Sequence, residues 1–109
     1  MNVSIRQLRV FVAAAKHGSF GKAAEEMHLT PPAVSMQIKE LEAQVGLPLF
    51  ERSGRKVMLT ITGEYLLVYA RKILATLKDA EDAVAKFRNL RTGRLSLGMV
   101  STAKYFLPR

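Results

Sequence analysis

Residues 29–46 decide the fold, and they read LTPPAVSMQIKELEAQVG. Thr30 can cap a helix with its hydroxyl, and Pro31 suits the first helical position, where a missing N–H costs nothing. Gly46 then ends the helix, and Pro48 prevents the helix from resuming. Between these ends, apolar residues recur at intervals of four, three and four, which places them on one buried face: Val34, Ile38, Leu41 and Val45. The stretch predicts one helix with defined ends.

Two shorter helices are predicted upstream. The first covers residues 4–17, where Ser4 and Gln7 have the spacing of a capping box. The second covers residues 20–27 and is capped by Ser19. Both helices have an apolar inward face, made of Ile5, Leu8, Phe11, Val12 and Ala15 in the first helix and Phe20, Ala23, Ala24 and Met27 in the second.

A β-hairpin is predicted after the third helix. Short apolar runs at 49–50 and 57–59 flank a basic turn that contains Gly54, which is typical of two short paired strands. The tip carries three positive charges: Arg52, Arg55 and Lys56. Two helices joined by a tight turn and followed by such a hairpin make up a winged helix-turn-helix.

A longer helix is predicted from residue 61 to residue 90, with Thr60 as its cap. Its apolar residues form a heptad seam, at alternating intervals of four and three: Leu66, Ala70, Ile73, Leu77, Ala80, Val84 and Phe87. A helix of this length would extend about 45 Å, which is too long for one small domain to bury. We therefore predict that residues 61–90 form a homodimer.

The last residues predict the start of another domain. Residues 94–101 alternate between apolar and polar types after a break at 91–93, which predicts a strand. Because a lone strand is not stable, we expect this strand to begin a truncated second domain. The predicted organisation is mainly α: a winged helix-turn-helix at 1–60, a linker and dimerisation helix at 61–90, and a hinge with a first strand at 91–109.

The charge of the chain favours a polyanionic partner. Its 109 residues include 17 Lys and Arg against 9 Asp and Glu, which gives a formal net charge of +8. Nucleic acid is the most common partner of such a domain. The alternative is a basic surface that has no partner.

Several other classes of protein are disfavoured. The chain has no cysteine, which excludes disulfides, zinc–cysteine sites and thiol nucleophiles. His17 and His28 lie near predicted helix ends, and we find no catalytic set, so we predict no enzyme activity, no metal and no cofactor. No apolar run approaches the roughly 18 residues of a membrane span. With no signal-peptide pattern either, we expect a cytoplasmic protein that does not bind membranes.

The predicted DNA-binding residues lie in three places. Helix N-termini attract phosphate, the outer face of the third helix can meet base edges, and a basic hairpin can reach phosphates or a minor groove. These residues are Ser19 and Phe20 at the start of the second helix, Thr30, Pro31, Pro32, Ser35, Met36 and Lys39 on the third, and Arg52, Arg55 and Lys56 on the hairpin.

Several of these residues also have a purely structural interpretation. Ser19 and Thr30 are helix caps, whether or not they also contact phosphate. Ser35 can donate to a carbonyl of its own helix instead of contacting DNA. Met36 is either a contact to thymine methyl groups or an exposed surface residue. The arginines of the hairpin can pair with Glu51 or solvent instead of a phosphate.

A nearly continuous set of residues matches a known pattern. It comprises Arg6-Gln7-Leu8, Phe11, Gly18-Ser19-Phe20, Ala23-Ala24, Leu29-Thr30-Pro31-Pro32-Ala33-Val34-Ser35, Gln37-Ile38, Leu41-Glu42, Gly46, Leu49-Phe50-Glu51-Arg52, Leu59-Thr60 and Gly63. This pattern resembles the N-terminal domain of LysR-type transcriptional regulators. The segment at 94–101 resembles the first strand of that family's effector domain.

The resemblance implies a sequence-specific transcriptional regulator of the bacterial cytoplasm and nucleoid. The long helix would pair antiparallel with its twin, and the full protein would often form tetramers. The target would be a dyad-symmetric operator in double-stranded DNA, with the third helix in the major groove and the wing near the minor groove. A small-molecule effector would act only through the missing C-terminal domain.

Two residues depart from the pattern of the family. Many members have glutamine in place of Pro31 and arginine in place of Met36, so direct readout is expected to rely on other residues of the third helix and on the wing. Met36, together with residues 101–106, resembles the subgroup that controls carbon-fixation operons. A different function, docking of another protein by the winged fold, would be favoured by an apolar hairpin tip, whereas this tip is basic.

Overall fold

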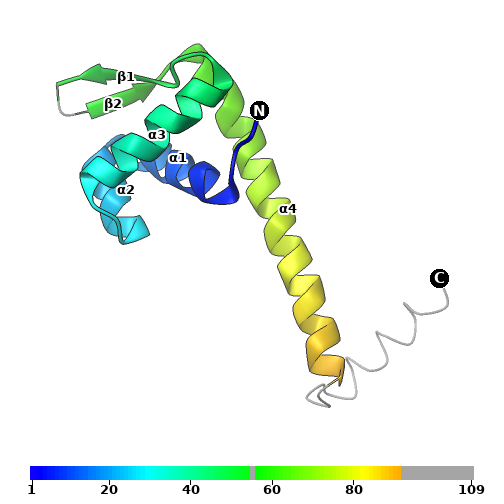
Figure 1. Ribbon diagram of the computed structural model, residues 1–109. Coiled ribbons are helices and arrows are strands. Elements are labelled where there is room, and N and C mark those ends of the chain that lie inside the picture. The colour runs from blue at the N-terminus through cyan, green and yellow to red at the C-terminus, as the bar shows by residue number, and fades with distance from the viewer. Residues whose placement is uncertain (55, 92–109) are drawn as a thin grey trace. The chain divides into compact units, whose positions relative to one another are not determined.

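The computed structural model describes residues 1–54 and 56–91 (Figure 1). Within them the chain forms four helices and a two-stranded hairpin: α1 (Ile5–His17), α2 (Phe20–Met27), α3 (Pro31–Val45), β1 (Phe50–Ser53), β2 (Lys56–Leu59) and α4 (Ile61–Arg91). This order confirms the predicted mainly α fold, with a winged helix-turn-helix followed by a long helix. The hinge and strand predicted at 91–109 fall, after Arg91, outside the described residues.

The predicted helix caps are present. The Ser4 hydroxyl accepts a hydrogen bond from the amide of Gln7 at 3.1 Å, and the Gln7 side chain accepts one from the amide of Ser4 at 3.0 Å. The Thr30 hydroxyl accepts from the amide of Ala33 at 3.3 Å. Gly46 ends α3 with a φ of 87°. These local signals fix where α1 and α3 begin and where α3 ends.

The turn between α2 and α3 is tight, as the sequence predicts. His28 ends α2 in the left-handed conformation with a φ of 58°, which is uncommon for a residue other than glycine. The amide of Leu29 then donates to the carbonyl of Ala24 at 2.8 Å. A strained residue here reverses the chain at once, so that α3 begins three residues after His28.

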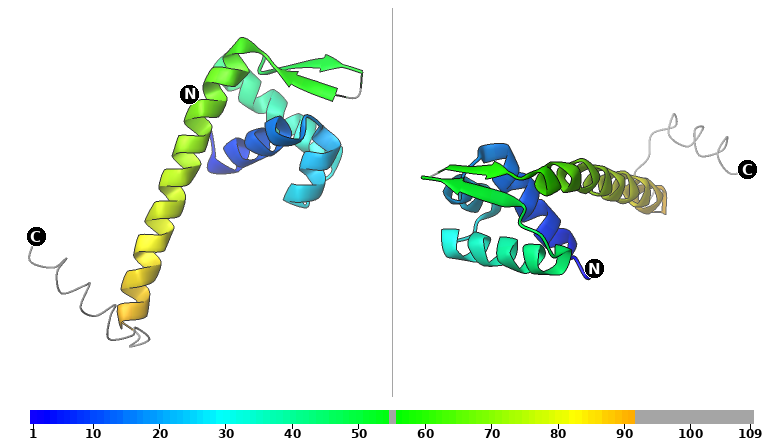
Figure 2. Two further views of the ribbon diagram at one scale, coloured as in Figure 1. Left: turned by 180° about the vertical axis from the view of Figure 1, so that it is seen from behind. Right: turned by 90° about the horizontal axis from the view of Figure 1, so that it is seen from above.

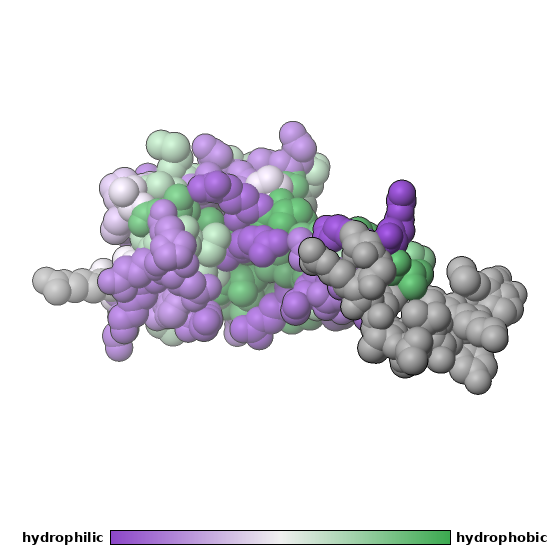
Figure 3. All heavy atoms as spheres, turned by 90° about the horizontal axis from the view of Figure 1, so that it is seen from below, coloured by the Kyte–Doolittle hydropathy of each residue, from purple (hydrophilic) through white to green (hydrophobic). Residues whose placement is uncertain are grey.

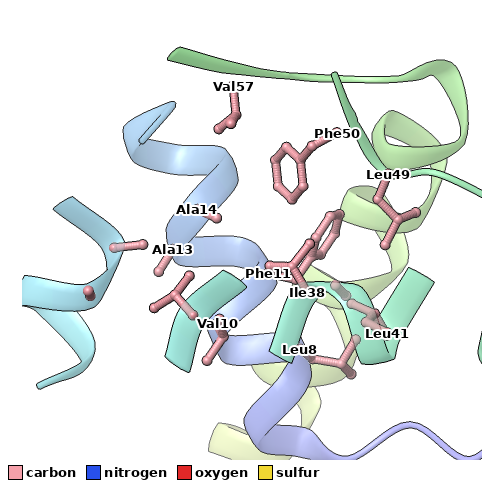
Figure 4. Close-up of a cluster of buried hydrophobic side chains, with 14 residues drawn as sticks. Leu8, Val10, Phe11, Ala13, Ala14, Ile38, Leu41, Leu49, Phe50 and Val57 are labelled. Atoms are coloured by element: carbon pink, nitrogen blue, oxygen red, sulfur yellow. The ribbon is translucent and has the colours of Figure 1, made fainter. Parts of the chain in front are cut away.

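One apolar cluster joins the three short helices to the hairpin (Figure 4). The ring of Phe50 packs edge-on against Phe11 and Phe20, with 5.5 Å between ring centroids in each pair. Edge-to-face contacts of this kind add to the stabilisation that burial provides. The cluster also includes Val34, Ile38 and Leu41 of α3, Ala23 and Ala24 of α2, and Leu49 and Val57 beside or within the hairpin.

The buried face of α1 differs from the predicted stripe. Leu8 and Phe11 are buried as expected, but Ile5 is 38% exposed. Four residues outside the predicted stripe are buried: the polar residue Gln7 and the apolar residues Val10, Ala13 and Ala14. Because α2 and α3 both pack against α1, the buried surface of α1 is wider than one helical stripe.

The backbone of Leu49 joins three elements. The Glu42 carboxylate of α3 accepts hydrogen bonds from the amides of Leu49, at 2.7 Å, and Phe50, at 3.3 Å. On the other side, the amide of Thr60 donates to the carbonyl of Leu49 at 3.0 Å, just before α4. The Thr60 hydroxyl also donates to the carbonyl of Pro48 at 2.7 Å. The end of α3, the hairpin and the start of α4 are therefore held together.

The hairpin is an antiparallel pair with Phe50 opposite Leu59 and Ser53 opposite Lys56. The amide of Val57 donates to the carbonyl of Gly18 at 3.1 Å, so β2 is attached to the turn between α1 and α2. The views in Figure 2 show the hairpin beside this turn. The wing is thus held by its backbone as well as by the buried side chains of Phe50 and Val57.

The helix α4 is continuous from Ile61 to Arg91, close to the predicted span. Its first half belongs to the winged domain, because the compact unit runs from Met1 to Ala75. Within this part Gly63 and Ala70 are buried, and Leu66, Leu67 and Leu74 pack against the cluster. In the part of the chain that the structure describes, no helix combines the length and apolarity needed to cross a membrane.

Gly63 lies where only a glycine fits. A Cβ at this position would collide with the carbonyl of Leu49 and come within 2.8 Å of a methyl group of Leu59. We predict that Gly63→Ala lowers the free energy of unfolding by about 2 kcal/mol or more, because the clash falls on backbone rather than on a flexible side chain. The measurement is thermal or urea unfolding followed by circular dichroism.

Gly21→Ala is the matched control. A Cβ at Gly21 in α2 would meet the Ser19 hydroxyl at 3.7 Å, an ordinary contact. This control should raise the free energy of unfolding by up to about 1 kcal/mol through helix propensity. Equal stability of the two variants would contradict the close approach of α4 to Leu49.

Candidate nucleic-acid interface

The outer face of α3 is free of contacts with the cluster. The caps and the buried stripe place Val34, Ile38 and Leu41 inward, so the residues between them point outward. The predicted DNA-binding residues Pro31, Pro32, Met36 and Lys39 are all exposed there. Met36 is the most prominent apolar member, with 62% of its surface exposed. An amphipathic helix exposed along one side in this way can enter a DNA groove.

Arg52 links the wing to both helices of the helix-turn-helix. Its guanidinium lies 5.1 Å from the ring centroid of Phe20, and one of its nitrogens donates to the Ser35 hydroxyl at 3.4 Å. The sequence suggested Glu51, solvent or a phosphate as the partner of this arginine, and missed this bridge. Because a guanidinium carries five donors, Arg52 can hold Ser35 in place and still contact an anion.

A basic concave surface lies where the hairpin meets the turn between α1 and α2. We call it the basic corner, and it is lined by His17, Gly18, Ser19, Lys22, Ser53, Lys56, Val57 and Met58. The Ser19 hydroxyl caps α2 here by accepting from the amide of Lys22 at 3.2 Å. Two lysines beside a helix N-terminus make a favourable position for a phosphate group.

Lys22 is a member of the basic corner that the sequence analysis missed. It lies three residues after the cap Ser19, at the positively polarised end of α2, and this position is the signal that could have identified it. Its neighbour across the corner is Lys56 of β2, which was predicted as a DNA-binding residue. Only the docking of β2 against the turn at Gly18 brings these two lysines to one surface.

An ion-pair cluster shares His17 with the basic corner. The Glu26 carboxylate lies 2.7 Å from Nε2 of His17 and 3.2 Å from Nζ of Lys16. The hydrogen bond with His17, followed by that with Lys16, lowers the pKa of the Glu26 carboxyl. The cluster ties the last turn of α1 to α2, which gives His17 a structural role.

The remaining predicted DNA-binding residues are placed as follows. Ser19 and Thr30 are helix caps, as their structural interpretation requires, and their contact with DNA stays a prediction. Phe20 is half-buried under Arg52. Arg55 lies outside the described residues.

The structure divides the predicted dimer seam into two parts. Leu66 packs against the cluster and Ala70 is fully buried in the winged domain, so Ala70 is not available to a partner. From Ile73 onward the seam is largely exposed, with Val84 at 60% and Phe87 at 55%. Leu77 is half-buried and Ala80 is exposed. On the face seen in Figure 3, hydrophobic residues are visible between hydrophilic ones.

An apolar patch at the start of α4 was not predicted from the sequence. Its members are large and exposed: Ile61, Tyr65, Val68 and Tyr69. None of these four residues belongs to the predicted seam, although Tyr69 lies beside it on the helix. Periodicity alone therefore did not identify them. The nitrogen of Lys72 lies 5.3 Å from the ring centroid of Tyr69.

An exposed and capped α3, a basic corner and a docked wing define a winged helix-turn-helix domain of the DNA-binding class. A sequence model described as "Bacterial regulatory helix-turn-helix protein, lysR family" matches residues 5–64. The chain therefore belongs to the lysR family of bacterial regulatory proteins, as its resemblance predicted.

Known members of the family resemble the chain over most of its length. It is 52% identical over 105 residues to the HTH-type transcriptional regulator CbbR of Rhodospirillum rubrum, covering 96% of the chain and 35% of the relative. It is 47% identical over 109 residues to the RuBisCO operon transcriptional regulator of Allochromatium vinosum, covering 100% and 36%. The chain thus spans about a third of the length of these curated relatives.

A solved structure supports the fold. In the crystal structure of the CbnR_DBD-DNA complex, the protein chain is 36% identical and superimposes with a TM-score of 0.73. The match covers 76% of this chain and 95% of the solved one. These relatives are transcriptional regulators, not enzymes, as the sequence predicted.

The basic corner predicts how DNA affinity depends on salt. We predict that Lys22→Ala and Lys56→Ala each weaken binding to all DNA sequences by a similar factor, and each reduce the slope of log affinity against log salt by about 1, because each removes one phosphate contact. Fluorescence anisotropy at several salt concentrations measures the slope.

Lys78→Ala is the control for this salt titration. Lys78 is an exposed lysine of α4 whose Nζ lies 3.7 Å from the Asp82 carboxylate. It is not among the residues that line the basic corner. Its replacement removes the same charge and should leave the slope unchanged. An equal change of slope in all three variants would mean that net charge, rather than the basic corner, determines the salt dependence.

Proposed function

We propose that this chain binds a dyad-symmetric operator in double-stranded DNA as a homodimer, with α3 in the major groove and the hairpin against the sugar-phosphate backbone. The observation that carries this proposal is the bridge that Arg52 of the wing forms to Ser35 of α3 and to the ring of Phe20. This bridge holds the wing and α3 in one fixed arrangement. The solved relative whose title describes a DNA complex supports it. Such a regulator would act in the bacterial cytoplasm, where the chromosome lies.

We propose further that the operator controls genes for carbon fixation. The relative from Allochromatium vinosum is named a RuBisCO operon transcriptional regulator, and its similarity extends over all 109 residues of this chain. The similarity therefore includes α4 and the residues after it, beyond the part that matches the family as a whole. Any response to a small-molecule effector, and any tetramer, would depend on protein outside these residues.

DNA from the promoter of a RuBisCO operon of the same genome tests both proposals. In a mobility-shift assay at physiological salt, we predict that the chain binds this DNA at least about a thousandfold more tightly than a scrambled sequence of equal composition. Equal affinity for the two would overturn sequence-specific binding. Specific binding to sites selected from random DNA, without binding to the promoter, would overturn only the carbon-fixation target.

The exposed part of α4 supports a homodimer with antiparallel helices. The predicted seam from Leu66 to Phe87 has its midpoint next to Leu77. We propose that the partner helix runs antiparallel and is centred at this point. The same alignment would set exposed Tyr69 against the exposed apolar end of the other α4.

Leu77 at the centre of this interface gives a direct test. We predict that Leu77→Asp converts the dimer to a monomer, because two symmetry-related carboxylates would be buried next to each other. Light scattering with sedimentation velocity measures the mass. Ala75→Asp is the matched control, because Ala75 is exposed and lies on the opposite side of α4 from the seam. A monomeric unmutated chain, or dissociation by both variants, would contradict the proposed interface.

A further inference from the structure

We propose that Met36 reads thymine in the operator through contact with the C5 methyl group in the major groove. This inference rests on the operator binding proposed above and names the chemical feature that α3 recognises. The observation that carries it is an exposed apolar stripe, Pro32 and Met36, on the same helix as exposed Lys39 and as Ser35, which Arg52 contacts.

The geometry of α3 places Pro32 and Met36 side by side on its outer face. They are four residues apart, which is the spacing of neighbours along one side of a helix. Val34 and Ile38, on the other side, are fully or almost fully buried. The outer side therefore faces away from the cluster, and Met36 projects from it with 62% of its surface exposed.

Neither outward side chain can form the usual hydrogen bonds to base edges. Proline has no N–H group, and the thioether of methionine is only a weak acceptor. Among the four bases, thymine alone presents an apolar group in the major groove, its C5 methyl. A flexible and polarisable methionine is suited to pack against that methyl group. The chemistry of this stripe thus selects one feature of one base.

The charges around Met36 identify DNA as the occupant of this surface. Ser35, which directly precedes Met36, lines one recess together with Lys39 and Arg52, and the Arg52 guanidinium lies 3.4 Å from the Ser35 hydroxyl. Glu42 also lines this recess, but its carboxylate accepts hydrogen bonds from the amides of Leu49 and Phe50. An apolar patch that docks an uncharged protein surface would gain nothing from the adjacent cationic groups of Lys39 and Arg52. A groove offers both partners at once, because methyl groups lie on its floor and phosphates on its edges.

Deoxyuridine substitution tests the contact, since it removes the C5 methyl group and leaves base pairing intact. Each thymine of an operator half-site, identified from the promoter or by selection from random DNA, is replaced in turn. We expect one or two positions to weaken binding of the unmutated chain about fourfold, the effect of one lost methyl contact. Met36→Ala should bind the normal operator more weakly and lose its sensitivity at those positions.

Leu47→Ala is the matched control, because Leu47 is 55% exposed and lies beyond the end of α3. It should keep the full sensitivity to deoxyuridine. The melting temperature and the salt slope of Met36→Ala should equal those of the unmutated chain, since the substitution removes no buried or charged group.

The possible outcomes are distinguishable. Loss of deoxyuridine sensitivity in Met36→Ala alone supports the contact. Specific operator binding without any sensitive thymine, or with sensitivity unchanged in Met36→Ala, overturns the contact and leaves the proposed function intact. Failure of the unmutated chain to distinguish operator from scrambled DNA overturns the proposed function and this inference together.

Discussion

The hydrogen bonds of the Leu49 backbone are the constraint on which the rest of the structure depends. Glu42 accepts from its amide, and Thr60 donates to its carbonyl, so the end of α3, the hairpin and the start of α4 meet at one buried backbone unit. Buried backbone groups without such partners would cost free energy, and here one partner belongs to α3 and the other lies between β2 and α4. The wing therefore cannot move independently of α3, and Gly63 must be small to allow α4 to begin there.

This connection explains how a small domain can present a surface suited to DNA. The buried stripe of α3 holds the helix against Phe11 and Phe50, which leaves its opposite side for an external partner. Arg52 then ties the wing to the same helix, while the basic corner lies where β2 meets the start of α2. Apolar and basic groups are thus fixed at defined positions, which reduces the cost of ordering them when DNA binds.

Much of this fold could be predicted because its signals are local. The capping box at Ser4 and the cap, proline and glycine of α3 concern residues a few positions apart, and the structure has all of them. The bridge from Arg52 to Ser35 and the lysine pair of the basic corner join residues distant in sequence. Periodicity likewise could not show that Ala70 faces its own domain, because the inner side of a helix depends on which elements pack against it.

Chemical methylation of the operator with dimethyl sulfate tests the central claim most directly, because the reagent marks guanine N7 in the major groove and adenine N3 in the minor groove. If two copies of α3 occupy the major groove, methylated guanines should block binding in two symmetric clusters separated by one helical turn, about 10 base pairs, or a multiple of it. Interference confined to adenines, with none at guanines, would place the protein in the minor groove and contradict the account.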